Sequence, residues 1–590
     1  MWNSQDHDVP GERKCTNLSS LFFCGGFVVI MLILVGYSGF YGDLNRLTKG
    51  YDDCGNICGV NNPKNKFDQC GMHDMTLKPK VLVETKIINY NETVSHFTCV
   101  EKCPNDYSEI FNRCWKKSKN AEGEVEGDEI GTVFQQIAQD LINLWPQIGL
   151  VCLVAFVFSY ILLLLFRYAI EYVIWIIYIS FIIVFAIGSI VFWYLFAVAG
   201  GEEKSGLLVG AIMFTLVTIL CSVLLYWFRR RIKLVAELFK EASRALIDVP
   251  QILFEPISTF ISLLLAFVAF VYFTIVIQTA GKLEEKRALD GQFQATYEQD
   301  AGMGIGAILN FIAFLWFTQF IFGCQHFVIS GTISKWYFAR DKTKLNSPVI
   351  TTFSHLLNFH LGSICLGSMV ITIVKILRMI FKAIENQSRE SGSPIVQCIA
   401  CFCGWIIQQL EELLKYLVRN AYIIVAKEGT PLYQSGKRAF HLLFENLMDV
   451  IALNQFGDIV LIVGRLFVVG IAGLIGYEIM NKPHINVLIV PLLISILFAF
   501  LIAHCFISVF EMTVDTIFIC FCIDCEENDG VTKQHYMSPG LKKIMSELKE
   551  TAGGQFNWGN MNNSVESGHL MGGNQPQPPY PINQPPYPTH

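Results

Sequence analysis

The sequence predicts an all-α polytopic membrane protein with about ten transmembrane helices and a disulfide-containing outer loop after the first of them. Only 16% of the 590 residues are charged, 53% are hydrophobic and the mean hydropathy is +0.43, whereas soluble domains carry about 25% charged residues. The apolar residues come in runs of about 20, the length that a helix needs to cross a bilayer. The run at 489–515 also carries ionisable side chains, which indicates a bundle with a polar interior.

These polar side chains lie on one face of the predicted helix. His504, Ser508, Glu511 and Asp515 are spaced four, three and four residues apart, which places them in one stripe at 3.6 residues per turn. An ionisable group in hydrocarbon costs several kcal/mol unless it finds a partner or water, so such groups face the inside of a bundle. A single lipid-exposed anchor would not carry this stripe.

The first predicted elements are a cytosolic segment and a retained transmembrane helix. Residues 1–18 are polar, and Arg13 and Lys14 directly precede the apolar run 19–41. This run is too long for the core of a signal peptide and lacks a small-residue cleavage site. We therefore predict a cytosolic N-terminus followed by a transmembrane helix.

Residues 42–146 form the predicted extracellular loop, which is polar and rich in cysteine. It contains a glycosylation sequon at Asn91 and six cysteines: Cys54, Cys58, Cys70, Cys99, Cys103 and Cys114. An even number of cysteines together with a sequon is typical of an oxidised, glycosylated loop. Six cysteines allow 15 pairings, and the sequence does not choose among them. The alternative is a set of free cytosolic thiols beside an unused sequon.

Residues 147–525 form the predicted transporter core. With the first helix at 19–41, the other predicted spans are 147–167, 169–197, 207–228, 252–279, 307–333, 351–374, 394–410, 457–477 and 485–507. A short turn at 167–171 separates the first two of these. Basic clusters at 229–233 and 335–344 fall on the cytosolic side under the positive-inside rule. Residues 229–248 have the pattern of an interfacial helix, with an extension of the preceding span as the alternative.

The seventh and eighth spans are the weakest. Residues 351–374 run on into Lys375, Arg378 and Lys382, and strict alternation would place this basic end outside, which the positive-inside rule disfavours. Residues 394–410 are a less apolar segment.

Two polar regions complete the chain. Residues 411–456 are predicted to form cytosolic amphipathic helices. Residues 526–590 are rich in Pro, Gly and Asn and end in a near-repeat at 576–588, which predicts a disordered cytosolic tail in extended conformation. A contact with an SH3, WW or trafficking partner is the alternative to a solvated tail.

No motif for an enzyme, a cofactor or a metal is complete. The glycines at 302–306 follow no predicted strand, so they do not form a phosphate-binding loop. Two cysteine groups lack the histidine or second pair that zinc needs: Cys398, Cys401 and Cys403, and Cys520, Cys522 and Cys525. His504 alone is a weak basis for a membrane-embedded enzyme. The net charge of −6 gives no indication of nucleic-acid binding.

Aromatic residues deep in the predicted spans suggest a site for an organic cation. These residues are Trp175, Tyr178, Tyr272, Trp316 and Phe320. Several aromatic faces around a dry pocket can hold a quaternary ammonium group by cation–π attraction, worth about 2 kcal/mol. The alternative for each of them is ordinary helix packing.

Several long motifs resemble those of the choline transporter-like proteins (solute carrier family 44), nearest to the type-1 branch. The resemblance extends from about residue 15 to residue 530, and the details of the outer loop and Cys525 depart from it. It is carried by the segment 497–515 with CFCID and NDG after it, and by FHLGS at 359–363, NAY at 420–422, RDK at 340–342, KEASRA at 240–245 and GDLNRL at 42–47.

This resemblance implies a ten-span carrier of choline, with ethanolamine as a second substrate, that supplies choline for phospholipid synthesis. It implies sodium-independent transport with proton exchange, cytosolic termini, a glycosylated outer loop and a place in the plasma membrane, with the mitochondrial membrane as a second location. The alternatives are a surface glycoprotein and a channel-like protein that conducts lipids or ions.

We hypothesise alternating access around an aromatic site, with two roles for the polar stripe. Glu511 and Asp515 are predicted to join a buried charge network with Lys375, Arg378 and Arg465, with a direct attraction on choline as the alternative. His504 is the candidate for proton coupling, since the unperturbed pKa of histidine is about 6.5 and burial shifts it easily.

Overall fold

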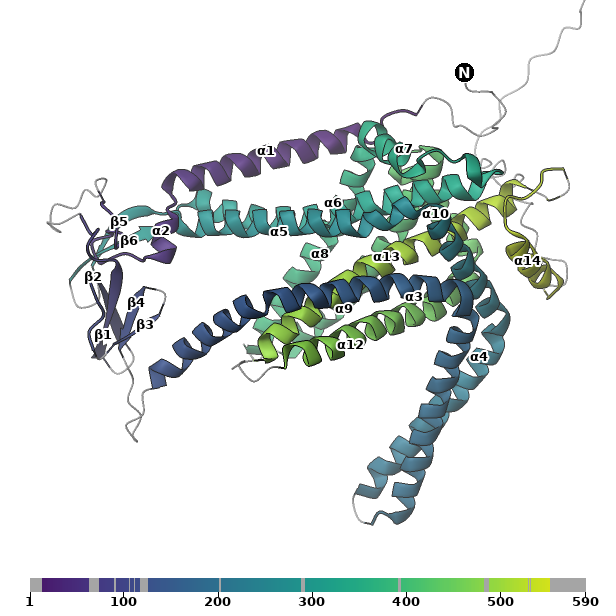
Figure 1. The fold of residues 1–590 in the computed structure, drawn as a ribbon, viewed down its shortest axis with the longest axis horizontal. Coiled ribbons are helices and arrows are strands. Elements are labelled where there is room, and N and C mark those ends of the chain that lie inside the picture. The colour runs from purple at the N-terminus through teal and green to yellow at the C-terminus, as the bar shows by residue number, and fades with distance from the viewer. Residues whose placement is uncertain are drawn as a thin grey trace, which may run out of the picture. The chain divides into compact units, whose positions relative to one another are not determined.

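The computed structural model describes residues 13–62, 74–89, 92–105, 107–110, 112–116, 126–200, 203–287, 292–390, 394–481, 488–528, 530 and 532–551. The chain divides into two compact units, residues 1–522 and 523–590. The unit 1–522 is a bundle of long helices with a small sheet module (Figure 1).

The helices of the unit 1–522 are α1 (Leu18–Tyr41), α2 (Leu44–Thr48), α3 (Glu126–Val198), α4 (Glu203–Asp248), α5 (Glu255–Thr279), α6 (Ala301–Phe338), α7 (Pro348–His355), α8 (Leu361–Glu390), α9 (Pro394–Glu428), α10 (Leu432–Glu445), α11 (Leu447–Ala452), α12 (Asp458–Met480) and most of α13 (Ile489–Glu527). Short 3₁₀ turns η2 (Pro250–Phe254) and η3 (Lys342–Lys344) precede α5 and α7. Two π-helical segments, η4 (Leu356–His360) and η5 (Leu453–Gly457), precede α8 and α12.

Nine helical segments among the described residues are long and apolar enough to cross a membrane. They correspond to nine of the ten predicted spans, so the fold class is confirmed. The predicted span 394–410 is the exception. It lies in α9, a 35-residue helix that packs between α6, α8 and α10 (Figure 1). Residues 411–428, predicted to begin separate amphipathic helices, continue α9 without a break.

The predicted turn at 167–171 is wrong. The chain stays helical through it, and α3 extends for 73 residues. The segment holds no glycine or proline, and each of its residues tolerates a helix, so nothing local ends the hydrogen-bond ladder. Its two apolar halves, 140–168 and 170–198, still qualify separately as spans. Helix α4 likewise continues through 229–248, which favours the extension of the preceding span over a separate interfacial helix.

The cysteine-rich module, residues 43–116, contains a four-stranded sheet in the order β2-β1-β4-β3. The strands are β1 (Lys80–Asn89), β2 (Glu92–Val100), β3 (Tyr107–Ile110) and β4 (Arg113–Lys116). Strand β1 is antiparallel to β2 and parallel to β4, and β3 and β4 are antiparallel. Helix α3 begins at residue 126, so the last part of the predicted outer loop is helical.

Disulfides hold this module together, as predicted. The bonded pairs are Cys58–Cys99 and Cys103–Cys114. Cys54 is also disulfide-bonded, while Cys70 and Asn91 lie outside the described residues.

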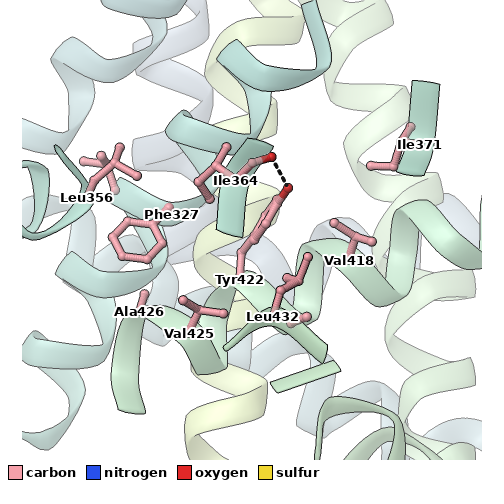
Figure 2. Packing of buried hydrophobic residues seen from close by; sticks show 11 residues of the cluster. Phe327, Leu356, Ile364, Ile371, Val418, Tyr422, Val425, Ala426 and Leu432 are labelled. Atoms are coloured by element: carbon pink, nitrogen blue, oxygen red, sulfur yellow. Dashed lines mark hydrogen bonds between the residues drawn. The ribbon is translucent and has the colours of Figure 1, made fainter. Parts of the chain in front are cut away.

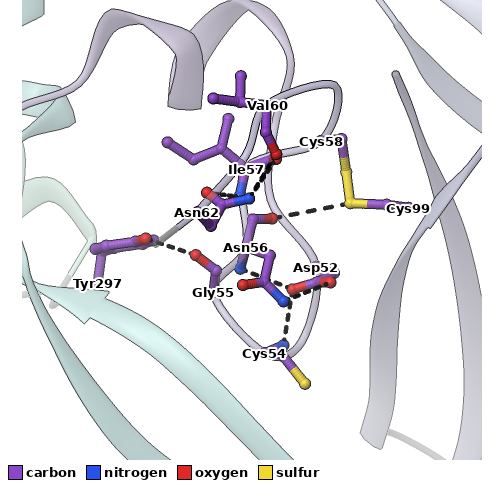
Figure 3. Close-up of a disulfide and its surroundings, with 10 residues drawn as sticks. All are labelled: Asp52, Cys54, Gly55, Asn56, Ile57, Cys58, Val60, Asn62, Cys99 and Tyr297. Atoms are coloured by element: carbon purple, nitrogen blue, oxygen red, sulfur yellow. Dashed lines mark hydrogen bonds between the residues drawn. A yellow bond between two sulfur atoms is a disulfide. The ribbon is translucent and has the colours of Figure 1, made fainter. Parts of the chain in front are cut away.

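Side-chain hydrogen bonds stabilise the loop that carries Cys58 (Figure 3). The Asp52 carboxylate accepts hydrogen bonds from the backbone N–H groups of Cys54 at 3.0 Å and Asn56 at 2.8 Å. Burial raises the pKa of Asp52, although these hydrogen bonds oppose the shift. The Asn62 amide bonds both the N–H and the carbonyl of Ile57.

A β-hairpin between α5 and α6 joins the bundle to the module. Its strands, β5 (Lys282–Arg287) and β6 (Phe293–Glu298), are antiparallel. The Ala295 N–H donates to the Asp53 carbonyl at 2.7 Å, and the Tyr297 hydroxyl donates to the Gly55 carbonyl at 2.6 Å (Figure 3). The Arg46 guanidinium lies 3.7 Å from the centre of the Tyr297 ring. The end of α1, the end of α5 and the beginning of α6 therefore all lie at the end of the bundle that carries the module.

A cluster of buried hydrophobic residues joins α6, α8 and α9 (Figure 2). Figure 2 shows the Tyr422 ring among Ile364, Val418 and Leu432, with its hydroxyl directed at the Ile364 carbonyl, 3.3 Å away. Close approach here requires glycine, because a Cβ on Gly367 would lie 2.2 Å from the Tyr422 hydroxyl oxygen.

The unit 523–590 is described from the end of α13 to α14 (Pro539–Thr551). The Asp524 carboxylate accepts from the backbone N–H groups of Tyr536 at 2.9 Å and Met537 at 2.8 Å, which folds the connecting loop onto the end of α13. The Pro-rich repeat lies outside the described residues, so its SH3 or WW contact stays a prediction.

We predict that the double variant Cys58→Ser/Cys99→Ser loosens the module. This disulfide closes a stretch of 41 residues, and the loss of a native disulfide of this kind costs about 2–4 kcal/mol. Limited proteolysis of the purified protein should cut the module at protease concentrations that leave the wild type intact. Cys398→Ser, which removes an exposed free thiol, is the matched control, and equal resistance of the double variant and the wild type would contradict the prediction.

Candidate functional site

Two arginines and two carboxylates join three helices of the sequence-predicted core. Arg419 of α9 forms ion pairs with two residues of α13, with Glu511 and, at 2.8 Å, with Asp515. Arg465 of α12 contacts the other carboxylate oxygen of Glu511 at 3.2 Å. The side chain of Asp515 is only 6% exposed. The predicted stripe on α13 therefore faces other helices, and its two acids are paired with arginines.

Of the predicted partners of these acids, only Arg465 contacts one. Arg378 of α8 instead pairs with Glu411 of α9 at 3.0 Å, and Lys415 contacts the same carboxylate. Lys375 has no ion pair within the described chain, although it interacts electrostatically with Glu411. The physical reason is that the basic end of α8 packs along α9, two helical turns before Arg419.

The sequence did not lead us to predict Arg419 as a member of the charge network. It lies in the region predicted to be cytosolic amphipathic helices, where charged residues need no buried partner. A signal was present, because Glu411, Lys415 and Arg419 are spaced four residues apart and share one face of a helix. The side chain of Glu411 is only 1% exposed.

Two histidines lie beside this charge network. His504 of α13 stacks parallel to Phe500, with ring centroids 6.2 Å apart, and interacts electrostatically with Arg465 and Glu511. Its Nδ1 is buried and has no hydrogen-bond partner among the described residues. His326 of α6, which the sequence did not single out, interacts electrostatically with Arg419 and Glu511.

The five predicted cage aromatics do not share one pocket, and within the described chain no ring contact joins any two of them. Trp316 is 5% exposed, donates its indole N–H to Ser368 at 3.0 Å and packs 5.1 Å from the Phe27 ring of α1. Phe320 packs on the cluster of α6, α8 and α9. Tyr272 is 54% exposed on α5. Trp175 is half-buried on α3, one turn before Tyr178.

Tyr178 is the predicted aromatic that lies beside the charge network. Its ring is 4.8 Å from the Phe456 ring, and its hydroxyl donates to the Gln455 carbonyl at 3.1 Å. Phe456 also contacts Phe228 of α4, at 5.7 Å. Asp458, two residues further, interacts electrostatically with Tyr178 and forms no ion pair among the described residues. The site therefore combines aromatic faces with a carboxylate that lacks a counter-ion.

The charges of this region do not balance. Electrostatic interactions connect Asp458 with Glu511, Arg419 and Arg465. Asp458, Glu511 and Asp515 carry three negative charges when ionised, against two positive charges on the arginines. Within the described residues this leaves one formal negative charge in excess, which a cation from outside the chain can neutralise.

Comparison with known proteins places this site in a family. The sequence profile described as "Plasma-membrane choline transporter" matches residues 212–526, more than half of the chain. The chain belongs to the choline transporter-like family. The matched range includes α9, α12 and α13 with every member of the charge network, while the cysteine-rich module lies before it.

Individual relatives agree over nearly the whole chain. "Choline transporter-like protein 1" of Torpedo marmorata is 28% identical over 91% of this chain and 94% of its own length, and the protein of that name from Rattus norvegicus is 28% identical over 92% of each. The human "Choline transporter-like protein 3" is also 28% identical, over 89% of this chain and 90% of its own. The type-1 relatives match over slightly more of this chain than the type-3 relative, 91–92% against 89%, in agreement with the predicted resemblance to the type-1 branch.

We predict that Arg419→Met strongly destabilises the protein. The substitution leaves Asp515 buried with no counter-ion, and breaking a buried ion pair costs about 3–5 kcal/mol. The melting temperature of the purified protein should fall clearly, and the double variant Arg419→Met/Asp515→Asn should recover part of the loss. Arg389→Gln, which breaks an exposed pair with Glu385 on α8, is the control and should change little. A melting temperature of Arg419→Met equal to that of the control would refute the role of Arg419.

Proposed function

We propose that this protein carries choline across a membrane by alternating access. The observation that carries the proposal is the carboxylate of Asp458, without an ion pair, beside the aromatic rings of Tyr178 and Phe456 in a chain that belongs to the choline transporter-like family. The relatives named above carry choline transport in their names. The function we assign is transport and not catalysis.

The chemistry of choline explains why such a site fits it. The trimethylammonium group has no N–H to donate, and its charge is spread over methyl groups. It is therefore held by aromatic faces and by a nearby negative charge, not by directed hydrogen bonds. Tyr178 and Phe456 offer the faces, with Trp175 one turn away, and Asp458 offers the charge. Trp316, Phe320 and Tyr272 stay candidates for another position along the route.

Ethanolamine is proposed as a second substrate. Its primary ammonium group donates hydrogen bonds, so it would depend more on the Asp458 carboxylate and less on the aromatic rings than choline does. The excess negative charge of the region suits both cations.

Proton exchange without sodium is the proposed mode of coupling, with His504 as the group that exchanges the proton. Its Nδ1 lacks a partner among the described residues, and its ring lies between Phe500 and the charges of Arg465 and Glu511. A proton on this imidazole would change the charge balance that choline also changes, which is the physical basis for coupling. We place the protein in the plasma membrane, with the mitochondrial membrane as the second candidate, supplying choline for phospholipid synthesis.

We predict saturable uptake of radiolabelled choline into proteoliposomes that contain the purified protein, with a KM that depends on the Tyr178 ring. Tyr178→Ala removes a cation–π contact of about 2 kcal/mol and should raise KM about 30-fold. Tyr178→Phe keeps the ring and should stay near the wild-type KM. Tyr194→Ala, at an exposed tyrosine of the same helix, is the control. A wild-type KM in Tyr178→Ala would exclude this residue, and uptake that never saturates would favour a channel.

We predict that His504→Gln uncouples choline uptake from the proton gradient. Glutamine keeps a polar side chain of similar length but does not titrate near neutral pH. Wild-type proteoliposomes should respond to an imposed outward pH gradient, while the variant should take up choline at a rate independent of it. His441→Gln, at an exposed histidine of α10, controls for a general effect of losing an imidazole. An undiminished response in His504→Gln would rule out this residue as the coupling group.

A further inference from the structure

A second charged cluster lies at the end of the bundle opposite the cysteine-rich module. There the segment before α1 is fixed against the start of α8 and of α10, and in Figure 1 the beginning of α1 lies beside α7. The Thr16 N–H donates to the Phe359 carbonyl at 2.8 Å, and the Asn17 side-chain oxygen accepts from Ser363 at 2.8 Å and from the Leu432 N–H at 3.1 Å. These contacts hold the neighbouring Arg13 in place.

Both ring nitrogens of His360 are used within this cluster. Nε2 lies 3.4 Å from an Arg13 guanidinium nitrogen, and Nδ1 lies 3.0 Å from the Thr16 hydroxyl. A guanidinium only donates, so Nε2 accepts, and the imidazole is neutral with its proton on Nδ1. The other end of the Arg13 fork donates to the Ala426 carbonyl at 3.0 Å. Arg13 thus retains its full charge with no carboxylate in contact.

Two further groups of the cluster have no hydrogen-bond partner among the described residues. The ammonium nitrogen of Lys335, near the end of α6, and Nδ1 of His355, at the end of α7, are buried and make no hydrogen bond to any described residue. Electrostatic interactions connect Lys335 with Arg13, and His355 with both. No carboxylate among the described residues contacts any of the three.

Three described acids at this end of the bundle are engaged elsewhere. Asp248 accepts from the Trp336 indole at 2.9 Å, Asp341 pairs with Lys344 at 3.1 Å, and Glu428 pairs with Arg438 at 3.0 Å. An unpaired buried ammonium costs several kcal/mol. Among the described residues, two cations and an imidazole thus share a site without a counter-ion, which favours the binding of an anion.

We propose that Arg13, Lys335 and His355 form a binding site for a phosphate group. A phosphate carries close to two negative charges, which matches the two permanent cations, and its oxygens can accept from guanidinium, ammonium and imidazole N–H groups at once. Arg13 is partly exposed, so the site is reached from solvent on its side. The phosphate belongs either to a soluble ion or ester or to a lipid headgroup at the membrane surface. This site is separate from the choline site and does not depend on it.

The test uses the full-length protein, purified in detergent without phosphate. The probes are inorganic phosphate, phosphocholine and, in nanodiscs, phosphatidylcholine with or without phosphatidylinositol 4-phosphate. Each active probe should raise the melting temperature of the wild type. Lys335→Met removes the ammonium but keeps the chain length, and should weaken binding of the active probe at least about tenfold. Lys344→Gln, at an exposed lysine of the same end, should bind like the wild type.

A second readout separates a ligand site from a structural role. Without phosphate, Lys335→Met should melt at a higher temperature than the wild type, because it removes an uncompensated buried charge. A lower melting temperature would mean that the ammonium has a partner within the chain, and would overturn the proposal. So would the absence of any response to all of the probes, or an equal response of Lys335→Met and the wild type. A response to inorganic phosphate identifies a soluble ligand, a response to phosphocholine counts only where Lys335→Met weakens it, and a response only to the phosphoinositide identifies a lipid headgroup. None of these readouts uses choline uptake, so their results do not depend on whether the proposed choline transport is confirmed.

Discussion

The sharing of one guanidinium by two carboxylates determines how the core is assembled. Arg419 cannot lose its proton, and neither Glu511 nor Asp515 can face lipid as an ion without a large cost. These three side chains therefore have to meet, which brings α9 against α13, and Arg465 then adds α12. The charged residues of α9 make it a long helix whose hydropathy does not qualify it as a span, yet Tyr422 and Val425 on the same side of the helix are both buried. The helix belongs inside the bundle because its charged and its apolar side chains both have partners there.

Features that depend on local sequence were predictable, and features that depend on contact between distant segments were not. Long apolar runs are a local property, so nine spans were found from the sequence. The false turn at 167–171 came from reading Arg167 and Glu171 as loop residues, although charge alone does not end a helix. The loop cysteines predicted disulfides, but which cysteines approach each other depends on how the chain folds back.

The same division applies to the site. Glu511, Asp515 and Arg465 were predicted from their depth in apolar runs, while Arg419 lay in a segment that hydropathy assigned to the surface. The position of a residue along a helix does not determine which neighbour its side chain faces. The five aromatic residues could therefore be chosen from the sequence, but the direction of their side chains could not be predicted. Trp316 is directed towards α1 and α8, and Tyr178 is directed towards η5 and the start of α12. Tertiary packing decides such orientations, and no single-helix pattern contains them.

The contact of the β5–β6 hairpin with α1 does not depend on pH in the physiological range. The Tyr37 hydroxyl and the Lys282 ammonium hold the pKa of Asp300 down to about 2, and Lys282 itself is raised to about 12. Both groups stay charged at every physiological pH, so the attachment of the β5–β6 hairpin to α1 does not titrate. This contact therefore offers no group for proton coupling, in contrast to the histidines His326 and His504, which adjoin the charge network.

The two π-helical segments occur at the two places where the charges do not balance. Segment η5 contains Gln455 and Phe456, the contacts of Tyr178, and ends directly before Asp458. Segment η4 ends at His360, whose ring is bonded to Arg13 and Thr16. A π turn is less stable than the α turn it replaces and is found frequently at functional sites. A helix retains such a turn where a side chain has to point in another direction. Here each π turn places a ring or a charged side chain in a cluster that has no counter-ion among the described residues. The π-helical backbone thus coincides with both proposed sites, the one for a cation and the one for an anion.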